Sequence, residues 1–322
     1  MANILENKTI LITGGVGSFG SKFVEIALAK YNPKSIRIFD ISEEKEVAME
    51  RKFQDTRLRF LIGDVRDRYR LERAMAGCDI VVHTAALKHV TVCEYNPIEA
   101  VRVNIDGAVN VVNAAIDQGV PKVIALSTDK AVYPVNLYGA SKMVMEKIFI
   151  QGNTYGANKG VKFACTRYGN VIGSSGSVAP LFKEQAKTGK ITITDEKMTR
   201  FWITLEQGVE FVIKSIERMD GGEVFVPKIP SMKIMDLANL IAPNAQKEII
   251  GIRPGEKIHE DLITKEEARH TKEYNDYFII EPEFSFWQYN EEKGGKPLAD
   301  GFKYTSDTNK QWLTEEDLKK II

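Results

Sequence analysis

Two residues with the chemistry of an acid–base pair stand four positions apart. Tyr138 and Lys142 lie in the segment NLYGASKMVMEK, and this spacing places both side chains on one face of a helix. A phenol ionises at about pH 10, and a neighbouring ammonium would favour its phenolate. Such a phenol can remove the proton of a substrate hydroxyl. The spacing alone is common by chance and usually marks a surface pair, so its context has to decide.

A glycine-rich turn near the N-terminus is the second candidate site. It stands in ILITGGVGSFG, directly after an apolar run and at the start of a helical pattern. Glycine lets the backbone approach a pyrophosphate, and the first N–H groups of a helix favour phosphate. This context predicts a dinucleotide site rather than a ligand-free turn. The residues expected to bind the dinucleotide here are Thr13, Gly14, Gly17, Ser18, Phe19 and Gly20.

Two aspartates follow the next predicted strands. Asp40 lies in IRIFDIS, about 20 residues after the glycine turn, where a carboxylate accepts hydrogen bonds from ribose hydroxyls. It would repel a 2′-phosphate, and Ile41 follows in place of a basic residue. We therefore expect NAD rather than NADP, although a helix-capping aspartate is a competing interpretation. Asp64, in FLIGDVRD, could reach the adenine amine or could be a turn aspartate.

Strand-like and helix-like patterns alternate through the first half of the chain. Short apolar strands alternating with helices predict βαβ units and a parallel sheet that is buried on both faces. Right-handed crossovers make such a sheet doubly wound. The expected strands are Thr9–Thr13, Ile36–Phe39, Arg59–Ile62, Ile80–His83, Val123–Ser127 and Phe163–Arg167, and the expected helices lie near Ser18–Lys30, Glu43–Arg51, Tyr69–Met75, Ile98–Gln118 and Leu137–Gln151.

The alternation of strand and helix patterns ends after about Arg167. Gly and Ser cluster there, and short elements mix irregularly. We expect residues 1–168 to form a dinucleotide-binding domain, with returns near 201–226, and residues 169–322 to form mainly a substrate-binding lobe. The predicted fold class is α/β: a Rossmann-type doubly wound parallel sheet with a smaller C-terminal substrate-binding lobe over the carboxyl ends of its strands. The segment Leu313–Ile322 predicts a short helix capped by Thr314, with Asp317 three residues on.

The composition argues against several classes of function. Of 322 residues, 43% are hydrophobic and 27% are charged, which is ordinary for a globular chain. Lys plus Arg and Asp plus Glu both number 44, which argues against a nucleic-acid partner. No run approaches the roughly 20 apolar residues of a membrane helix, and the N-terminus has no signal-peptide pattern, so we expect a cytoplasmic protein. Three cysteines and four histidines show no metal-binding spacing.

Longer motifs resemble those of one enzyme family. The segments TGGVGSFG, HTAALKH, STDK and YGASK are similar to those of the extended short-chain dehydrogenase/reductases that act on nucleotide sugars. In the second half, RYGNVIGSSGSV, TDEKMTRFWIT, GGEVFVPKIPSMKI and IIGIRPGEKIHE closely resemble the inverting UDP-N-acetylglucosamine 4,6-dehydratases that begin pseudaminic acid synthesis. The resemblance extends from Lys8 to about Leu313.

The resemblance implies a three-step reaction. C4 of the sugar is oxidised by hydride transfer, water is lost across C5–C6, and the hydride returns to C6 while C5 is reprotonated from the opposite face. Tyr138 and Lys142 would serve the first step, with Thr128 bonded to the C4 hydroxyl. Asp129 would then be the acid and Lys130 the base of the elimination. Retaining dehydratases generally carry glutamate at the position of Lys130, which supports inversion; a turn ion pair is the alternative.

Further residues are expected around the two ligands. Lys88 follows the fourth strand, at the junction of cofactor and substrate. Arg200 and Arg253 are candidates to clamp the diphosphate, because guanidinium binds phosphate bidentately. A solvated surface charge is the alternative for each, and a structural role is the alternative for Asn104. The substrate-binding set is Lys88, Asn170, Arg200, Arg253 and Glu256, and the remaining cofactor-binding set is Val65, Ala85, Ala86, Lys88, Asn104, Tyr138 and Lys142.

The chain departs from the family pattern at three places. Inverting dehydratases carry Ser-Arg-Asp after the second strand and are expected to use NADP, whereas this chain has Asp40-Ile41-Ser42. We therefore predict NAD, and NADP is the alternative from the resemblance. Ser175 stands where relatives often have arginine, and Tyr133-Pro134 replaces a smaller or amide side chain.

Two alternative functions compete with this prediction. One keeps the fold and changes the chemistry, as a retaining 4,6-dehydratase or a 4-epimerase of a UDP-sugar. The other is a non-catalytic dinucleotide-sensing or scaffold protein, which would not need both Tyr138 and Lys142. The resemblance also implies a homo-oligomer, often a hexamer.

Overall fold

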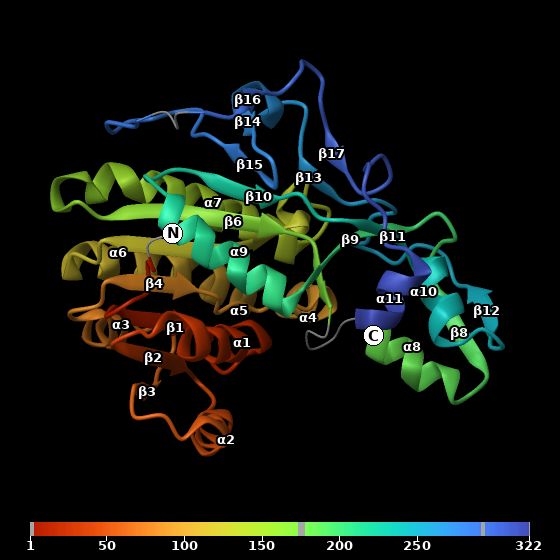
Figure 1. The fold of residues 1–322 in the computed structure, drawn as a ribbon, viewed down its shortest axis with the longest axis horizontal. Helices are drawn as coiled ribbons and strands as arrows, with labels where there is room; N and C mark the ends of the chain where they lie inside the picture. The colour runs from red at the N-terminus through yellow and green to blue at the C-terminus, as the bar shows by residue number, and fades with distance from the viewer. Residues whose placement is uncertain (1–2, 173–177, 291–293, 322) are drawn as a thin grey trace.

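A parallel sheet forms the centre of the molecule. The computed structural model describes residues 3–172, 178–290 and 294–321. Within these ranges, a ten-stranded sheet has the order β16-β14-β15-β10-β6-β5-β4-β1-β2-β3 (Figure 1). Its parallel strands are β1 (Thr9–Thr13), β2 (Ser35–Asp40), β3 (Leu58–Ile62), β4 (Ile80–His83), β5 (Lys122–Thr128), β6 (Lys162–Tyr168) and β10 (Val224–Pro227).

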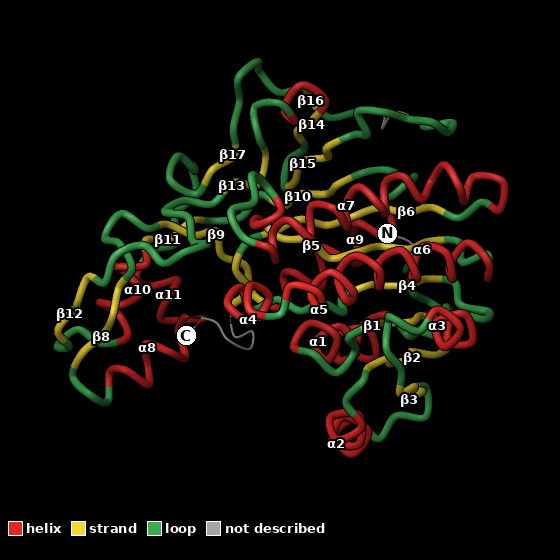
Figure 2. The backbone as a smooth tube through the Cα atoms, turned by 180° about the vertical axis from the view of Figure 1, so that it is seen from behind, coloured by secondary structure: helices red, strands yellow, loops and turns green. Residues whose placement is uncertain are grey.

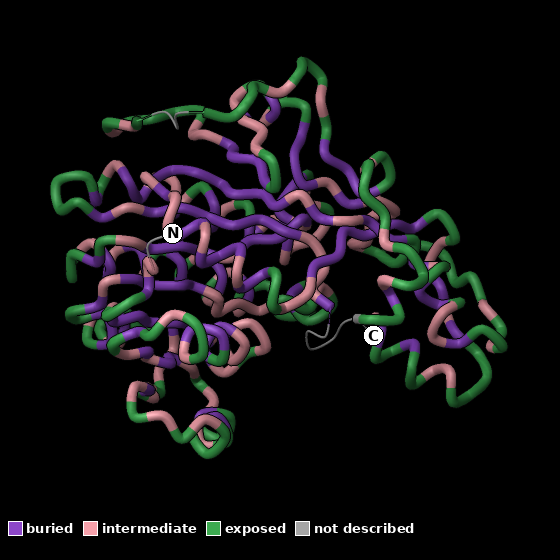
Figure 3. Tube along the Cα trace, in the orientation of Figure 1, coloured by how far each residue is buried: buried purple, intermediate pink, exposed green. Residues whose placement is uncertain are grey.

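The predicted strands are confirmed. Those at Thr9–Thr13 and Ile80–His83 have the predicted bounds. Each of the other four is longer than predicted by one residue at one end or at both ends. All residues of β1 and β4 are buried, and Figure 3 shows buried stretches along the central strands. The doubly wound α/β fold class is therefore correct, because strands covered on both faces need continuous apolar runs.

Helices cover both faces of this sheet. One face carries α1 (Ser18–Ile26) and α9 (Leu205–Arg218), which pack on each other (Figure 1). The opposite face carries α3 (Arg68–Met75), α6 (Gly107–Gln118) and α7 (Leu137–Gly156) (Figure 2). The helix α2 (Glu43–Phe53) lies near the β3 edge. Among the described helices, none combines the length and apolar character that crossing a bilayer requires.

Two helical details differ from the prediction. The predicted helix at Ile98–Gln118 consists of α5 (Pro97–Val101), a π-helical turn η2 (Arg102–Asp106) and α6. Such turns insert an extra residue into the helix and are frequent near functional sites. The helix α4 (Val90–Tyr95) was not predicted, because VTVCEY is short and rich in β-branched residues. In α1, the last turn widens into a second π-helical turn, η1 (Ala27–Tyr31).

The C-terminal half contributes to two regions. Edge strands β15 (Tyr277–Ile280), β14 (Thr271–Glu273) and β16 (Lys296–Pro297) join the main sheet in antiparallel order beyond β10. The predicted boundary at residue 168 did not anticipate these edge strands, and it stays a prediction. A second hydrophobic cluster, which includes Phe182, Ile191, Trp202 and Leu237, forms a small lobe.

The remaining elements build this lobe and its connections to the main sheet. Thr314 and Asp317 exchange hydrogen bonds at the start of the last helix, which confirms the predicted cap. Ser175, which stands where relatives often have arginine, lies outside the described residues. The other strands and helices are β7 (Asn170–Ile172), β8 (Lys190–Ile193), β9 (Thr199–Thr204), β11 (Ser231–Lys233), β12 (Gln246–Ile249), β13 (Asp261–Ile263), β17 (Tyr304–Thr305), α8 (Val178–Ala186), α10 (Ile234–Ile241) and α11 (Glu315–Ile321), with short 3-10 turns η3 (Asp129–Ala131), η4 (Ala157–Lys159) and η5 (Glu267–His270).

A buried arginine joins the two halves of the chain. Arg167, near the end of β6, forms a bidentate pair with Glu146 of α7 at 3.0 and 2.7 Å. The same guanidinium bonds both carboxylate oxygens of Glu267 in η5 and the backbone oxygen of Leu262 in β13. Arg167 is 3% exposed, so this pairing is needed to offset the cost of removing its charge from water.

Replacing Arg167 by Ala should lower the free energy of unfolding by about 3–5 kcal/mol, because it leaves two carboxylates without their buried partner. Chemical denaturation at neutral pH measures this change. The matched control is Arg68→Ala, which removes an exposed arginine that pairs with Glu72 and Asp117. Exposed pairs contribute little, so equal losses in the two variants would contradict the structural role of Arg167.

Candidate active site

The glycine turn forms one wall of a cavity of about 390 Å³ at the carboxyl ends of β1, β2 and β4. Gly14 has φ +67°, and a Cβ there would lie 2.9 Å from the Ala85 backbone and from Thr84 Oγ1. Helix α1 follows Gly17 without a side-chain cap, so its first N–H groups face this region unoccupied by a capping side chain. The turn therefore has the close approach and the free helix start that a pyrophosphate needs.

Six of the residues predicted to bind the dinucleotide line this cavity. Gly14, Asp40, Asp64, Val65, Ala85 and Ala86 all line it. Gly17, Ser18, Phe19 and Gly20 form the start of α1. Thr13 is fully buried, bonds His83 across the sheet at 2.8 Å and accepts the N–H of Ala85, so its side chain fixes the spacing of β1 and β4.

The two aspartates of the cavity have different partners. Asp40 accepts backbone N–H groups from Val16 of the glycine turn at 3.3 Å and from Ser42 at 3.2 Å. Ser42, rather than Asp40, is the N-cap of α2, and Ile41 beside it is 69% exposed. Asp64 is held by the guanidinium of Arg66 at 2.8 and 2.6 Å, so the predicted contact to an adenine amine would compete with Arg66.

Asn104 braces the segment that links the two ligand regions. Its side chain bonds both the N–H and the carbonyl of Leu87 and also Ser141 Oγ of α7. The π-helical turn η2 carries this buried side chain. Lys88 follows Leu87, and burial lowers its pKa. Lys88 thus lies in sequence between Leu87, which lines the dinucleotide cavity, and Val90, which lines a second cavity.

The candidate catalytic residues lie where β5 meets α7. Thr128 ends β5 and donates to Asp129 Oδ1 at 2.9 Å, and the turn η3 carries Asp129 and Lys130. Helix α7 packs directly against this turn, since a Cβ on Gly139 would overlap the Lys130 carbonyl oxygen. Tyr138, the preceding residue, therefore lies close to the turn.

The ionisation of Tyr138 differs from the prediction. Burial raises its pKa to about 12, and the charge of Lys130 opposes this rise. Lys130, rather than Lys142, is thus the cation that acts most on the phenol. Lys142 is buried with its Nζ 3.0 Å from Met145 Sδ, and burial lowers its pKa to about 8. Lys142 is not among the groups that most affect the pKa of Tyr138, so the phenolate-favouring role of Lys142 stays a prediction.

Asp129 and Lys130 form a close ion pair in which only the carboxyl is fully buried. The Lys130 Nζ lies 2.9 Å from Asp129 Oδ1, and the Asp129 side chain is 0% exposed. Burial raises the pKa of Asp129, and the charge of Lys130 opposes this rise. The neighbouring carboxylates raise the pKa of Lys130 despite burial, so the ammonium is retained. The sequence could not give these directions.

The predicted substrate residues border a second cavity, of about 540 Å³. Asn170, Arg200, Arg253 and Glu256 line it together with Lys130. The predicted turn at Pro254-Gly255 is confirmed: Glu256 N donates to Arg253 O, and Gly255 has φ +79°. Asn170 Oδ1 and Glu256 Oε2 are buried and find no hydrogen-bond partner among the described residues, so both atoms are suited to bind a polar ligand.

Arg200 is engaged differently from the other candidates. Its guanidinium donates to the backbone oxygens of Thr199, Lys257 and Ile258 at 2.7 to 2.9 Å, and its Nε lies 3.7 Å from Glu260. Most of its donors are therefore used within the protein. This geometry favours a positive charge at the cavity wall over the predicted bidentate clamp.

The sequence analysis did not single out the segment that closes over the catalytic turn. We call residues 255–267 the clamp segment. It contacts the region 130–136 at four places: Asn136 to Gly255, Lys257 to Val132, Glu260 to Lys130, and Glu266 to Tyr133. Lys257 ends the motif RPGEK, and Glu260 follows three residues later. Their place in or beside that motif was the available signal for them. In the described part of the chain, no potential metal-ligating side chains gather in groups of three.

Known proteins are similar to this chain over almost its whole length. A family model described as "Polysaccharide biosynthesis protein" matches residues 10–282. The UDP-N-acetylglucosamine 4,6-dehydratase (inverting) of Campylobacter jejuni is 48% identical, over 99% of this chain and 98% of that protein. The UDP-glucose 4-epimerase of Rickettsia rickettsii is 41% identical, over 98% and 95%. The X-ray structure of Pen from Bacillus thuringiensis matches with a TM-score of 0.91 and 38% identity, over 99% and 98%.

Replacing Gly139 by Ala should displace the turn η3, because the added methyl overlaps the Lys130 carbonyl. A misplacement of about 1 Å near reacting groups costs roughly 100-fold in turnover, which steady-state kinetics measures. The dinucleotide content should stay unchanged, since the glycine turn lies elsewhere. Gly208→Ala in α9 is the control, where the nearest atom to a new Cβ lies 4.0 Å away. Equal turnover in both variants would refute the packing argument.

Proposed function

The chain belongs to the polysaccharide biosynthesis protein family, within the extended short-chain dehydrogenase/reductases that act on nucleotide sugars, and from this premise we propose that it is an inverting UDP-N-acetylglucosamine 4,6-dehydratase. The observation that carries the proposal is the pairing of the buried Asp129 with Lys130 beside Thr128 and Tyr138. Oxidation at C4 needs only a phenol and a dinucleotide. A buried carboxyl with a raised pKa is the additional proton donor that loss of water requires.

The dinucleotide cavity fits NAD. The Gly14 backbone, the uncapped start of α1 and the alanines 85 and 86 would hold the pyrophosphate and the nicotinamide half. The Asp40 carboxylate would hold the adenosine ribose and repel a 2′-phosphate, and no basic side chain follows it. When bound, the nicotinamide supplies a hydride acceptor for C4 and returns the hydride to C6.

Tyr138 would take the proton of the C4 hydroxyl. Its pKa of about 12 means that the phenol is protonated before substrate binds, so it needs positive charge to act as a base. Lys130 already supplies such a charge, and the oxidised dinucleotide and Lys142 would add to it. Thr128, at the end of β5, would bond the same hydroxyl and orient it.

Asp129 would donate a proton to the C6 hydroxyl. The C6–O bond breaks, water leaves, and the electron pair of the C5–H bond forms the C5–C6 double bond as a base takes the C5 proton. Burial raises the pKa of Asp129, which suits this carboxyl to act as a proton donor. Lys130 would be the base, as in the resemblance, and it must first lose the proton that its two carboxylate neighbours stabilise.

The second cavity would hold the UDP-sugar. Arg253 at its rim and the charge of Arg200 in its wall suit a diphosphate, and the unpaired oxygens of Asn170 and Glu256 suit sugar or ribose hydroxyls. Lys88 would contact both ligands from the segment between the cavities. We also expect a homo-oligomer in the cytoplasm, as the family resemblance implies; sedimentation measures the assembly.

Incubation of the purified protein with UDP-N-acetylglucosamine, without added cofactor, should yield the 4-keto-6-deoxy sugar. The bound dinucleotide is regenerated in each cycle, so none has to be supplied. NMR in heavy water should show a C6 methyl signal, one deuterium at C5 and the inverted C5 configuration.

The same spectra separate the alternatives. A C4 epimer without a methyl signal would establish the 4-epimerase function, which the relatives named UDP-glucose 4-epimerase make the main competitor. Retained configuration at C5 would establish a retaining dehydratase. Tyr138→Phe is the control variant, because it should keep the dinucleotide bound and form no product.

NAD should bind the dinucleotide-free protein at least about tenfold more tightly than NADP, because Asp40 repels a 2′-phosphate. Calorimetry measures both affinities. Asp40→Ser combined with Ile41→Arg should reverse the preference, since it removes the carboxylate and adds a phosphate partner. Glu43→Lys makes the same change in net charge on α2, outside the cavity lining, and should not reverse it. If the unaltered protein bound NADP more tightly than NAD, the assignment of NAD as the cofactor would be wrong.

A further inference from the structure

We propose that Glu260 is a positioning residue that holds the Lys130 ammonium against Asp129, so that Lys130 lies where it can act on the sugar once it has lost its proton. The inference rests on the proposed dehydratase function and extends it. No motif chemistry in the sequence pointed to Glu260.

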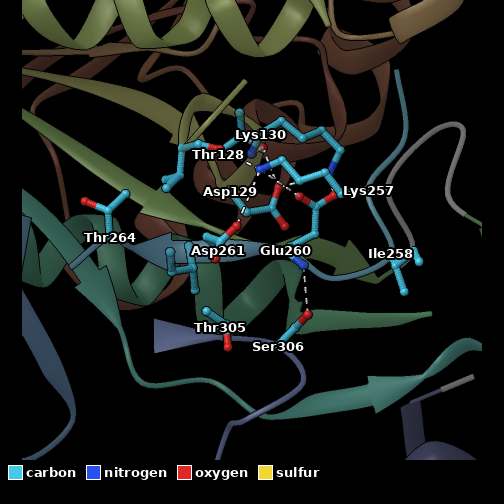
Figure 4. Close-up of polar contacts among 12 residues, drawn as sticks. Thr128, Asp129, Lys130, Lys257, Ile258, Glu260, Asp261, Thr264, Thr305 and Ser306 are labelled. Carbon is cyan, nitrogen blue, oxygen red and sulfur yellow. Dashed lines mark hydrogen bonds and ion pairs between the residues drawn. The ribbon is translucent and has the colours of Figure 1, made fainter. Parts of the chain in front are cut away.

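The first support is the geometry around Lys130. Its Nζ lies 2.9 Å from Asp129 Oδ1 and 3.2 Å from Glu260 Oε1 (Figure 4). One ammonium is therefore shared by two carboxylates that come from distant parts of the chain. Both are removed from water, since Asp129 is 0% and Glu260 2% exposed. Lys130 itself lines the substrate cavity together with Glu260.

The second support is the fixed backbone of Glu260. Its N–H donates to Ser306 Oγ at 2.9 Å, and its carbonyl accepts the N–H of Ser306 at 2.8 Å (Figure 4). The Ser306 hydroxyl is bonded in turn to Thr199 Oγ1 at 2.7 Å. Glu260 thus has little freedom to follow Lys130, so the lysine is held at the place that Glu260 sets.

The third support is the unequal surroundings of the two carboxylates. Glu260 has cations on three sides, with Lys130 at 3.2 Å and both Arg200 and Lys257 at 3.7 Å. Among the described residues, Asp129 has Lys130 as its one cationic partner, and its Oδ2 is buried without a hydrogen-bond partner. A proton is therefore favoured on Asp129, and the negative charge is favoured on Glu260. The opposite pKa directions of the two groups, up for Asp129 and down for Glu260, agree with this division.

This division gives Glu260 a positioning role and no part in the proton transfer. Three cations hold its negative charge, so it stays ionised and keeps the Lys130 ammonium beside Asp129. Lys130 gives up its own proton to solvent, and the free amine can then take the C5 proton.

Other charged groups lie near Lys130, Asp129 and Glu260 and influence their pKa values. Tyr138 and Asp129 face Lys130 from α7 and η3, Arg200 faces Glu260 from β9, and Lys257 and Asp261 flank Glu260 in the clamp segment. His259, next in sequence, bonds Thr199 instead. Among these groups, two carboxylates lie within hydrogen-bond distance of Lys130: Asp129 and Glu260.

The test is Glu260→Gln, followed by rapid mixing with UDP-N-acetylglucosamine. Oxidation at C4 does not use Glu260, so reduced dinucleotide should appear at about the unaltered rate. Its return to the oxidised form should slow about 100-fold, because Lys130 is no longer held in place beside Asp129. The rise of this rate with pH should begin at a lower pH than in the unaltered protein, because the lost carboxylate stabilised the Lys130 ammonium.

Controls separate this role from a loss of structure. Glu267→Gln also removes a buried carboxylate beside a cation, and it should lower the unfolding temperature without trapping reduced dinucleotide. Glu260→Asp keeps a carboxylate and should restore part of the rate and the pH profile of the unaltered protein. Equal return rates, or equal pH profiles, for Glu260→Gln and the unaltered protein would overturn the inference.

A measurement without substrate keeps the inference distinct from the proposed function. NMR of protein carrying 13C-labelled lysine, assigned with Lys130→Met, should show a lower titration midpoint for Lys130 in Glu260→Gln, since a carboxylate that stabilises its ammonium is lost. An unchanged midpoint contradicts the role of Glu260 whatever the substrate is. If the midpoint falls but the unaltered protein does not convert UDP-N-acetylglucosamine, the dehydratase proposal fails instead.

Discussion

The sharing of one ammonium by two buried carboxylates is the interaction on which the site depends. A buried carboxylate without a partner would cost several kcal/mol, so the burial of Asp129 and Glu260 depends on Lys130. Asp129 and Lys130 come from the turn after β5, and Glu260 lies in the clamp segment directly before β13. The dinucleotide-binding sheet and the C-terminal half must therefore be in register for the charges to balance, and the rest of the C-terminal architecture serves this requirement.

Three other contacts fix the same two segments relative to each other. Arg167 links β6 to the end of the clamp segment through Glu267, Lys257 donates to the Val132 carbonyl, and Ser306 secures the Glu260 backbone. On the opposite side, Gly139 brings α7 against the turn, and Asn104 ties α7 to the segment after β4. Tyr138 thus receives its position from the same contacts as Asp129. Oxidation and elimination can share one sugar pose because a single rigid unit carries both sets of groups.

The sequence could predict what depends on local pattern. The six strands were predicted to within a residue at each end, because continuous apolar runs mark buried parallel strands, and the glycine turn was predicted because its residue types permit one geometry. It could not predict what depends on distant segments. The helix α4 and the π-helical turn at Asn104 follow from packing, and the guanidinium of Arg200 is used by backbone carbonyls that no spacing reveals. The positions of Lys142 against Met145 and of Glu260 against Lys130 likewise follow only from the folded chain.

The origin of the Glu260 contact has a consequence for how the chain reaches its native state. A ribosome releases Asp129 and Lys130, with the whole of β1 to β6, well before it releases the clamp segment, and domains fold as they emerge. The sheet can assemble while Lys130 still lacks its second carboxylate and Arg167 lacks Glu267. During that interval, water has to solvate these charges in a site that is later dry. Closure of the late segment is therefore the step that expels this water, so the core of the first strands can form before the site is competent.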